Sequence, residues 1–588
     1  MKKSIPLTIF LLSIIFWYLE QNIYFFNEYM FILIAIISGY FTLMVWLEFT
    51  SKNFQLKFKN KFLIYCPYLF LISLFVVIIS DYFITPIIIY IIFSGLSIIF
   101  GLGSLKIIKF EVDKDLGLTK KSHFVLTIFL FCLILGIYLY LNITNSLIDT
   151  DEMRLLYDAK LITTGVTPFI NFNSRSPALV YLLSGLYHFW GNKIILYRIF
   201  TAIIAWGSSI ILYLIGKKFF TRFQSLLLAS FYAFLPITLN FLYIKTETFS
   251  IFFALLSVLL FSISYEDNKH KYLRYISHLI MLIALLIRPT IILFYLFHIL
   301  ITINNNQKES WFRKIKIILL EIFITGIIFI SSTFLFFKSH NSLFYTNSFK
   351  EFNIDYNSYI RFLLTPYYVP LTVIILSVIS VLNVIQDNII KKSKFLITTI
   401  IILIMFIIAY VINTFLLGFW PQYYMDFAVP FSILSISSAI FISQISGNNK
   451  IFIIIFTTII IISFATSYNS LNSYFLKNNW NISSIQKTSI IIDNNSDTND
   501  IIFSGNPVFS IMSDRKQFMN LSHSFYDPES VDYVIKKLIE NEPRIIIVDD
   551  RYIINYYLDK PLFQNLLSSC YHQIDNSIVY KLNSSCSN

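Results

Sequence analysis

Charged residues are scarce in this chain. Only 13% of its 588 residues are Asp, Glu, Lys or Arg, whereas about 25% is usual for a soluble globular protein. Hydrophobic residues make up 56% of the chain, and its mean hydropathy is +0.70. This composition excludes an ordinary soluble enzyme and indicates a protein built to lie in lipid.

Cysteine is also rare, and no His/Cys cluster has the spacing of a metal site. Cys66 and Cys132 lie in apolar runs, where we expect small buried groups. Cys570 and Cys586 flank an expected β-hairpin at 571–582, and an extracytoplasmic location permits a disulfide between them. No cofactor is predicted with certainty, although carboxylates could bind a divalent cation with help from residues elsewhere.

Long apolar blocks alternate with short charged stretches along the chain. Each block has roughly 17–22 residues, the length that a helix needs to cross a hydrocarbon core about 30 Å thick. The first block, 5–18, follows Lys2 and Lys3 but has no small-residue cleavage site after it, so we expect a retained helix. The sequence thus predicts an all-α polytopic membrane protein with about a dozen or more crossings.

The basic loops predict the orientation of these crossings. Four lysines at 52–61 and five at 106–121 mark cytoplasmic loops if the N-terminus is cytoplasmic. A span at 123–141 then delivers residues 142–176 to the outer face of the membrane. The outer loop at 142–176 is therefore the first place to look for extracytoplasmic chemistry.

The stretch Pro177–Trp190 is too short to cross a membrane and is predicted to be a helix at the outer surface. Lys245 and Glu247 are expected to form a local ion pair between two later spans. The apolar stretch 276–300 is interrupted by Arg288-Pro289, which predicts either a hairpin with Arg288 near its outer turn or a single kinked span. The spans expected between these features are 198–216, 225–243 and 248–264.

The segment 469–588 is expected to form a small extracytoplasmic α/β domain. Strand-like runs at 501–503 and 544–548 alternate with a helix-like run at 528–540. This segment carries ten Lys/Arg and thirteen Asp/Glu, so the net charge of +12 comes entirely from the membrane part. Membrane topology explains that excess, and nucleic acid is excluded as a partner.

Three carboxylates, Asp149, Asp151 and Glu152, stand in the outer loop just before an amphipathic run. On residue chemistry alone a structural role is favoured. Asp149 or Thr150 can cap a helix, and acidic residues stabilise its positive N-terminus. The competing interpretation is a catalytic carboxylate at the membrane surface.

A second feature of the same loop is Arg175, followed by Ser176 and Pro177. Ser176 is a good N-cap and Pro177 suits the first helical position. The free amides of such a helix start bind anions, and a guanidinium beside them is well placed to hold a phosphate. The alternative is an interfacial arginine that reaches lipid headgroups. Carboxylates and a phosphate site in one outer loop are what transfer from a lipid phosphate requires.

The stretch 149–220 resembles the first outer loop and next span of the GT-C glycosyltransferases. The likeness is to the protein O-mannosyltransferase and lipid A aminoarabinose transferase group. The shared elements are Asp151-Glu152, the turn Gly165–Pro168, Arg175-Ser176-Pro177, the short helix 177–191 and a span that opens with Arg198. Weaker agreement covers 123–465, including 286–290 and 423–430. The helices before His123 are outside the usual family plan, and 421–423 lacks the basic residue often found there.

The resemblance implies a GT-C-like helical bundle that transfers a hexosyl or pentosyl group, with inversion, from a polyprenyl-phosphate donor on the outer face. Asp151 would be the general base, Glu152 would orient the acceptor, and Asp149 is the rival base. Arg175 and Arg288 would stabilise the departing phosphate. Further contacts with donor or acceptor are expected from Tyr423, Tyr424 and Arg198, the last being otherwise structural.

Three units are expected along the chain. They are a four-helix membrane region (1–122), a catalytic membrane region (123–467) with surface helices at about 149–190, and the extracytoplasmic domain (468–588). The protein would be a multi-pass enzyme of cell-envelope glycosylation in the cell membrane, in contact with membrane lipids. Its acceptor, whether a glycan, a lipid or a protein, stays open.

Two other functions fit parts of the sequence. An O-antigen polymerase or ligase would use Arg and His in a large late outer loop, and 338–366 offers His340, Lys350 and Arg361. A flippase or transporter would place polar residues within its spans and show internal repeats. The spans are nearly free of charge and the halves show no repeat, which favours an enzyme at the interface.

Overall fold

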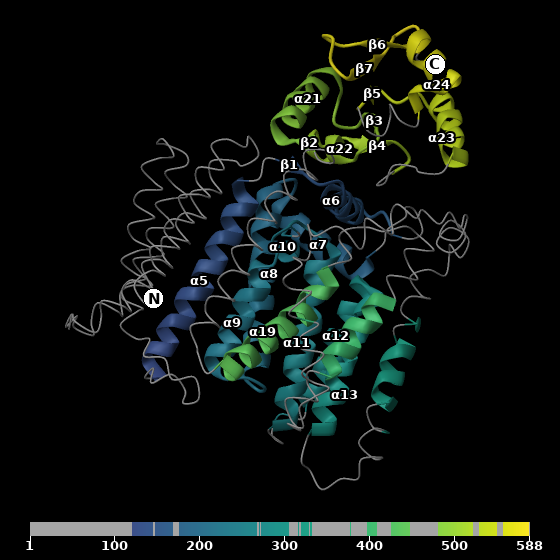
Figure 1. Cartoon of the computed structure of the whole chain (residues 1–588). Coiled ribbons are helices and arrows are strands. Elements are labelled where there is room, and N and C mark those ends of the chain that lie inside the picture. The colour runs from purple at the N-terminus through teal and green to yellow at the C-terminus, as the bar shows by residue number, and fades with distance from the viewer. Residues whose placement is uncertain are drawn as a thin grey trace, which may run out of the picture.

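The computed structural model describes most of the chain between Lys120 and Asn304, short apolar pieces between 316 and 446, and residues 480–586 with gaps at 521–527 and 550–556 (Figure 1). Several predicted features lie outside the described residues: Cys66, Arg175, Tyr423, Tyr424, the loop 338–366, the boundary at 467–468 and nearly all of 1–122. The boundary expected at 122–123 falls inside a helix that begins at Lys120.

Three helices of the described part are long and apolar enough to cross a membrane. They are α5 (Lys120–Thr144), α8 (Ile194–Gly216) and α11 (Thr246–Glu266). α8 packs against both α5 and α11. A Cβ at Gly207 would lie 2.7 Å from the Phe252 ring, so the missing side chain lets α8 and α11 approach closely. The spans predicted from 123, 198 and 248 coincide with these helices.

The predicted span at 225–243 is wrong in its length. α9 (Arg222–Phe234) begins with a capping box between Thr221 and Gln224 and ends after 13 residues. A separate short helix, α10 (Pro236–Asn240), follows it. Pro236 explains the break, because proline lacks an N–H and its ring collides with the preceding turn of a helix. α9 is therefore shorter than the length that crosses a bilayer.

The apolar stretch around Arg288 is a hairpin, as the first of the two expectations had it. α12 (Tyr272–Ile287) ends at Arg288, whose extended backbone leads into the 3₁₀ helix η2 (Pro289–Phe294) and α13 (Tyr295–Asn304). His278 Nδ1 lies 3.2 Å from the Tyr295 hydroxyl, and Thr302 on α13 donates to Tyr265 near the end of α11. The two legs therefore run antiparallel, with Arg288 at the turn.

The short surface helix was predicted correctly as α7 (Pro177–Trp190). One of its faces is buried through Leu179, Val180 and Leu183, while Phe189 and Tyr181 on other faces are exposed. α7 contacts both α12 and the preceding helix α6 (Thr150–Thr163), and α6 lies between the helical bundle and the C-terminal region (Figure 1).

The C-terminal region, residues 480–586, is the expected α/β unit. Its sheet has the order β4-β3-β5-β7-β6, in which β3, β4 and β5 are parallel. β7 pairs antiparallel with both β5 and β6. The strands are β3 (Ile501–Ser504), β4 (Lys516–Gln517), β5 (Ile545–Ile547), β6 (Tyr571–Gln573) and β7 (Val579–Leu582).

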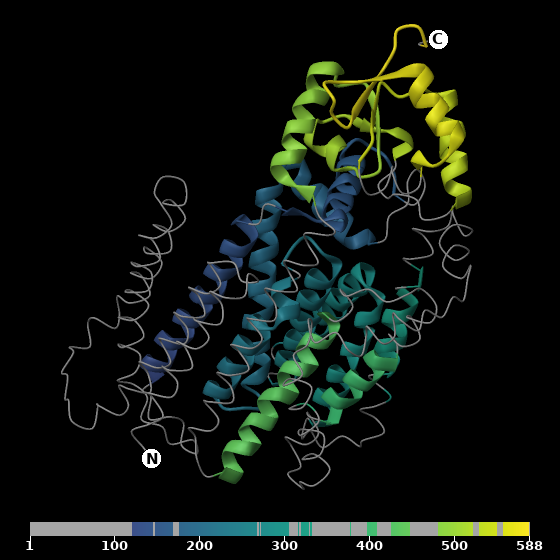
Figure 2. The ribbon, with the colours of Figure 1, turned by 45° about the horizontal axis from the view of Figure 1, so that its top comes forward.

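Both faces of this sheet are covered by helices (Figure 2). Ile545 and Ile547 belong to a core with α21 and α22, whereas Ile546 belongs to a second core with α23 and α24. This alternation is the period of two that a strand imposes. The helices are α21 (Ile482–Asn495), α22 (Val508–Met512), α23 (Pro528–Glu540) and α24 (Pro561–Cys570).

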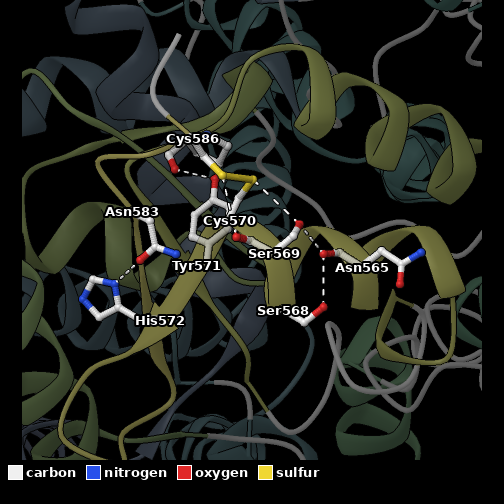
Figure 3. The surroundings of a disulfide bond; sticks show 9 residues. Asn565, Ser568, Ser569, Cys570, Tyr571, His572, Asn583 and Cys586 are labelled. Atoms are coloured by element: carbon white, nitrogen blue, oxygen red, sulfur yellow. Dashed lines mark hydrogen bonds between the residues drawn. A yellow bond between two sulfur atoms is a disulfide. The ribbon is translucent and has the colours of Figure 1, made fainter.

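The predicted β-hairpin is present, and the two cysteines that flank it, which the sequence left open, form a disulfide (Figure 3). Asp575 and Asn576 form its turn with φ values of 46° and 52°, a left-handed conformation that suits two-residue hairpins. Cys570 and Cys586 are bonded across the base of the hairpin, with their Cα atoms 5.5 Å apart. Cys132 in α5 is a free thiol, only partly buried.

Removing the disulfide should destabilise the C-terminal region. Cys570→Ser/Cys586→Ser frees a loop with a sequence separation of 16. A loop of this size predicts a loss of about 3 kcal/mol in the free energy of unfolding. Protection of this region from thermolysin, titrated with urea in the full chain, measures the loss. Cys132→Ser is the matched control, and an equal effect of both changes would contradict the prediction.

Candidate active site at the start of helix α6

Asp149 is the N-cap of α6. Its backbone is extended, and its side chain accepts a hydrogen bond from the Asp151 amide at 2.9 Å. Asp151 and Glu152 follow in the first turn, where negative charge is favourable. The helix-capping interpretation of Asp149 is therefore correct, and it leaves open what the other two carboxylates do.

Glu152 is fully buried in a bidentate ion pair with Arg198 of α8. Arg198 Nε lies 3.0 Å from Oε1 and Nη2 lies 2.8 Å from Oε2, and the two side chains are 2% and 0% exposed. The guanidinium also lies over the Tyr243 ring at 5.3 Å from its centre. Arg198 thus makes the structural contact that the sequence analysis gave as its alternative role, since a buried charge needs a partner.

Asp149 and Asp151 share the ammonium group of Lys245. Its Nζ lies 3.1 Å from Asp149 Oδ1 and 3.3 Å from Asp151 Oδ2. The Asp151 side chain is 43% exposed, whereas those of Asp149 and Lys245 are 8% and 4% exposed. Asp151 is therefore the carboxylate of the three that a solute can reach.

The Asp149 carboxyl has an altered proton affinity. Burial raises its pKa above the ordinary value of 3.8. Lys245 opposes this shift, and the nearby carboxylates of Asp151 and Glu152 add to it. Loss of solvation disfavours the charged form of a carboxyl, and like charges act in the same direction.

Arg288 lies at the tip of its hairpin between two carboxylates. It forms an ion pair with Glu247 of α11 and lies 3.2 Å from Asp426 Oδ2. Thr290 donates to the same Asp426 oxygen at 3.1 Å. The expected local pair between Lys245 and Glu247 is therefore wrong, because each of these residues has a partner on a different element.

Asp426 was missed by the sequence analysis. It stands just before α19 (Ala428–Ser446), in the segment where Tyr423 and Tyr424 were singled out. The available signal was Arg288 itself, since a cation in an apolar stretch requires a counter-charge. Asp426 is an acidic residue beside another apolar stretch and was a candidate for that role.

Ser176 occupies the N-cap position of α7 but does not cap it. Its hydroxyl instead donates to the carbonyl of Ile287, at 3.1 Å. This contact joins the start of α7 to the residue before Arg288. The helix start that was predicted to bind phosphate therefore lies beside the Arg288 turn. The Ser176 hydroxyl joins these two segments and does not cap α7.

No group of three or more His, Cys, Asp or Glu side chains in a metal-binding arrangement occurs among the described residues. The chemistry available to the site is that of one accessible carboxylate, a buried lysine and a paired arginine. These come from α6, from the start of α11 and from the hairpin turn.

Residues 174–336 match the sequence family described as dolichyl-phosphate-mannose-protein mannosyltransferase. This stretch of the chain is therefore similar to the glycosyltransferases of that family. The match covers less than a third of the 588 residues and includes Arg198, Lys245 and Arg288, while the carboxylates of α6 lie before it. This family match and the three long apolar helices indicate association with a membrane.

Two crystal structures of the Archaeoglobus fulgidus oligosaccharyltransferase are similar in outline. One, a complex with Zn and sulfate, is 12% identical and has a TM-score of 0.42. The aligned part covers 66% of this chain and 62% of the oligosaccharyltransferase chain. The other, tethered to an acceptor peptide, is 10% identical with a TM-score of 0.43 and covers 71% and 69%. This chain thus spans less than two thirds of the first of them. Among curated proteins, no sequence matches the chain.

The buried Glu152–Arg198 pair should be intolerant of single changes. Glu152→Gln leaves the arginine charge without a carboxylate and should lower the free energy of unfolding by about 3–5 kcal/mol. The charge-free pair Glu152→Leu/Arg198→Met should recover most of that loss. Thermal unfolding in detergent compares these variants, with Glu540→Gln as the control because the Glu540 side chain is exposed. Equal loss in the single and double variants would refute the prediction.

Proposed function

We propose that the chain transfers a sugar from a polyprenyl-phosphate donor to an acceptor hydroxyl on the extracytoplasmic face, with Asp151 as general base. The observation that carries the proposal is the contrast among the α6 carboxylates. Glu152 is buried in an ion pair with Arg198, and Asp149 caps the helix. Asp151, in contrast, is accessible and forms an ion pair with Lys245. The family match supports the reaction class.

In the proposed reaction Asp151 accepts the proton of the acceptor hydroxyl. The acceptor oxygen forms a bond to the anomeric carbon from the side opposite the leaving group. The bond from that carbon to the phosphate oxygen breaks, and polyprenyl phosphate departs with the electron pair. Backside displacement inverts the anomeric configuration.

The other residues of the site would position groups and balance charge. Lys245 fixes the Asp151 carboxylate, and Asp149 fixes both the lysine and the helix start. Arg288, oriented by Glu247 and Asp426, and Arg175 are proposed to stabilise the departing phosphate. Glu152 would act through Arg198, which joins α6 to α8, and not through the acceptor.

The proposed location is a membrane with the N-terminus in the cytoplasm and α6 and the C-terminal region outside. The basic loops support this orientation. The Cys570–Cys586 disulfide supports it independently, since disulfides persist outside the cytoplasm. The family description names dolichyl-phosphate mannose, so mannose on a polyprenyl phosphate is the donor to test first.

Asp151→Asn should abolish the base while leaving the helix intact. The assay follows radiolabelled mannose from undecaprenyl-phosphate mannose, either as transfer to acceptors in isolated membranes or as hydrolysis with water as the acceptor. Its rate should fall by roughly 10²–10⁴-fold. Asp149→Asn should cost less, because asparagine is also a good N-cap. Asp497→Asn, on the surface of the C-terminal region, is the control. A larger loss in Asp149→Asn would make Asp149 the base instead.

The raised pKa of Asp149 predicts an acid limb in the pH profile of turnover above pH 3.8. As the pH falls through that pKa, Asp149 takes up a proton and its attraction for Lys245 is lost. In Asp149→Asn this limb should be absent, because asparagine does not titrate. The pH dependence of kcat in both proteins measures this, and an unchanged limb would contradict it.

The titration of Asp149 affects stability in the opposite direction from turnover: its protonation lowers turnover but raises the free energy of unfolding. The folded chain holds the Asp149 proton more tightly than the unfolded chain does. The contribution of this carboxyl to the free energy of unfolding is therefore largest below pH 3.8 and is lost as the pH rises through the raised pKa.

A further inference from the structure

The C-terminal region contacts α6 at the end that carries the carboxylates. The strand β1 (Leu147–Ile148) pairs antiparallel with β2 (Trp480–Asn481), with Leu147 opposite Asn481 and Ile148 opposite Trp480. Asp149 follows Ile148 directly. The residue that caps α6 therefore directly follows a strand, β1, that is paired with a strand of the C-terminal region, β2.

The other end of α6 is held by Lys160. Its Nζ donates to the carbonyls of Ser510 at 3.1 Å and Arg515 at 3.3 Å, and lies 2.7 Å from Asp514 Oδ1. These three acceptors match the three hydrogens of an ammonium group. Ser510 is in the last turn of α22, where a cation interacts favourably with the helix carbonyls.

The middle of α6 is attached as well. The backbone N–H of Gln517 in β4 donates to the Tyr157 hydroxyl at 3.1 Å, and Tyr157 is buried. Met153 and Leu156 share one hydrophobic core with Phe509 and Ile511 of α22. α6 thus lies between the helical bundle and the C-terminal region and packs against both (Figure 2).

The attachments at the two ends of α6 are connected within the C-terminal region. α21 begins directly after β2 and ends at Asn495, with Ser496 as its C-cap. Arg515 donates to the Ser496 carbonyl at 2.7 Å and forms an ion pair with Asp493. The chain from β2 through α21 to Arg515 therefore links the strand beside Asp149 to the turn that binds Lys160.

We propose that the C-terminal region positions the catalytic carboxylate, and that Lys160 is the positioning residue through which it acts. The proposal rests on the function proposed above. An isolated helix of 14 residues is marginal in water, so α6 depends on its neighbours for its position. Catalytic groups displaced by about 1 Å can lose roughly 10²-fold in rate. Holding α6 at both ends keeps Asp151 beside Lys245.

The kinetic test compares Lys160→Met, Lys160→Arg and Lys536→Met in the full chain, with undecaprenyl-phosphate mannose as donor. Lys536 is exposed on α23 and is the matched control. We expect kcat to fall by about 10-fold or more in Lys160→Met with the donor KM unchanged. Lys160→Arg should restore most of it, because it keeps a charged donor. Loss of donor affinity instead of kcat, or no difference from Lys536→Met, overturns the proposal.

Amide hydrogen exchange gives a readout that does not depend on turnover. Lys160→Met should speed amide exchange at Thr150–Met153, about two to three turns away from the substitution. Asp514→Asn removes one exposed contact of Lys160, cannot be blamed on misfolding of the core, and should give a smaller change in the same amides. Exchange confined to the last turn of α6 overturns the positioning role. A different result is faster exchange at Thr150–Met153 in Lys160→Met together with no sugar transfer by the wild-type chain. That result contradicts the proposed function and leaves the positioning of α6 by the C-terminal region intact.

Discussion

The bidentate pair between Glu152 and Arg198 is the contact on which the arrangement of the site depends. It joins the 14-residue helix α6 to the long apolar helix α8, and both of its charges are buried. A buried charge without a partner is costly, so the two helices are held together by a strong penalty against separation. This ion pair also fixes the directions of the neighbouring carboxylates. Because Glu152 points into the bundle, the preceding residue Asp151 points to a different side of α6, where it is partly exposed.

The same constraint recurs at the start of α11. Lys245 and Glu247 are two residues apart, and each pairs with a different element: Lys245 with α6, Glu247 with Arg288. The tip of the α12–α13 hairpin and the start of α6 are therefore coupled through a single short segment. Because Lys245, Glu247 and Arg288 are poorly solvated, moving one element leaves a buried charge on the next without its partner. The result is a connected layer of paired charges at the start of α6, the start of α11 and the hairpin tip.

Much of this fold could be predicted from the sequence because its signals are local. The apolar length of α8 and α11, the proline and short length of α7, and the short apolar runs of strands β3 and β5 each depend on neighbours in sequence. The α9 break could also have been seen, since Pro236 stands inside the expected span. What local patterns could not supply was pairing at a distance. Lys245 and Glu247 look like partners along the chain, and only their three-dimensional neighbours show otherwise. Asp426 was missed for the same reason, being 138 residues from Arg288.

The sharing of one lysine by two carboxylates has a consequence for charge during the proposed reaction. With all three groups ionised, Asp149, Asp151 and Lys245 together carry one net negative charge. When Asp151 takes the proton of the acceptor, that net charge becomes zero and its hold on the ammonium weakens. Asp149 still lies 3.1 Å from the lysine, so the cation is never left without a counter-ion. The group that caps the helix is in this sense also the resting partner of the lysine through each turnover.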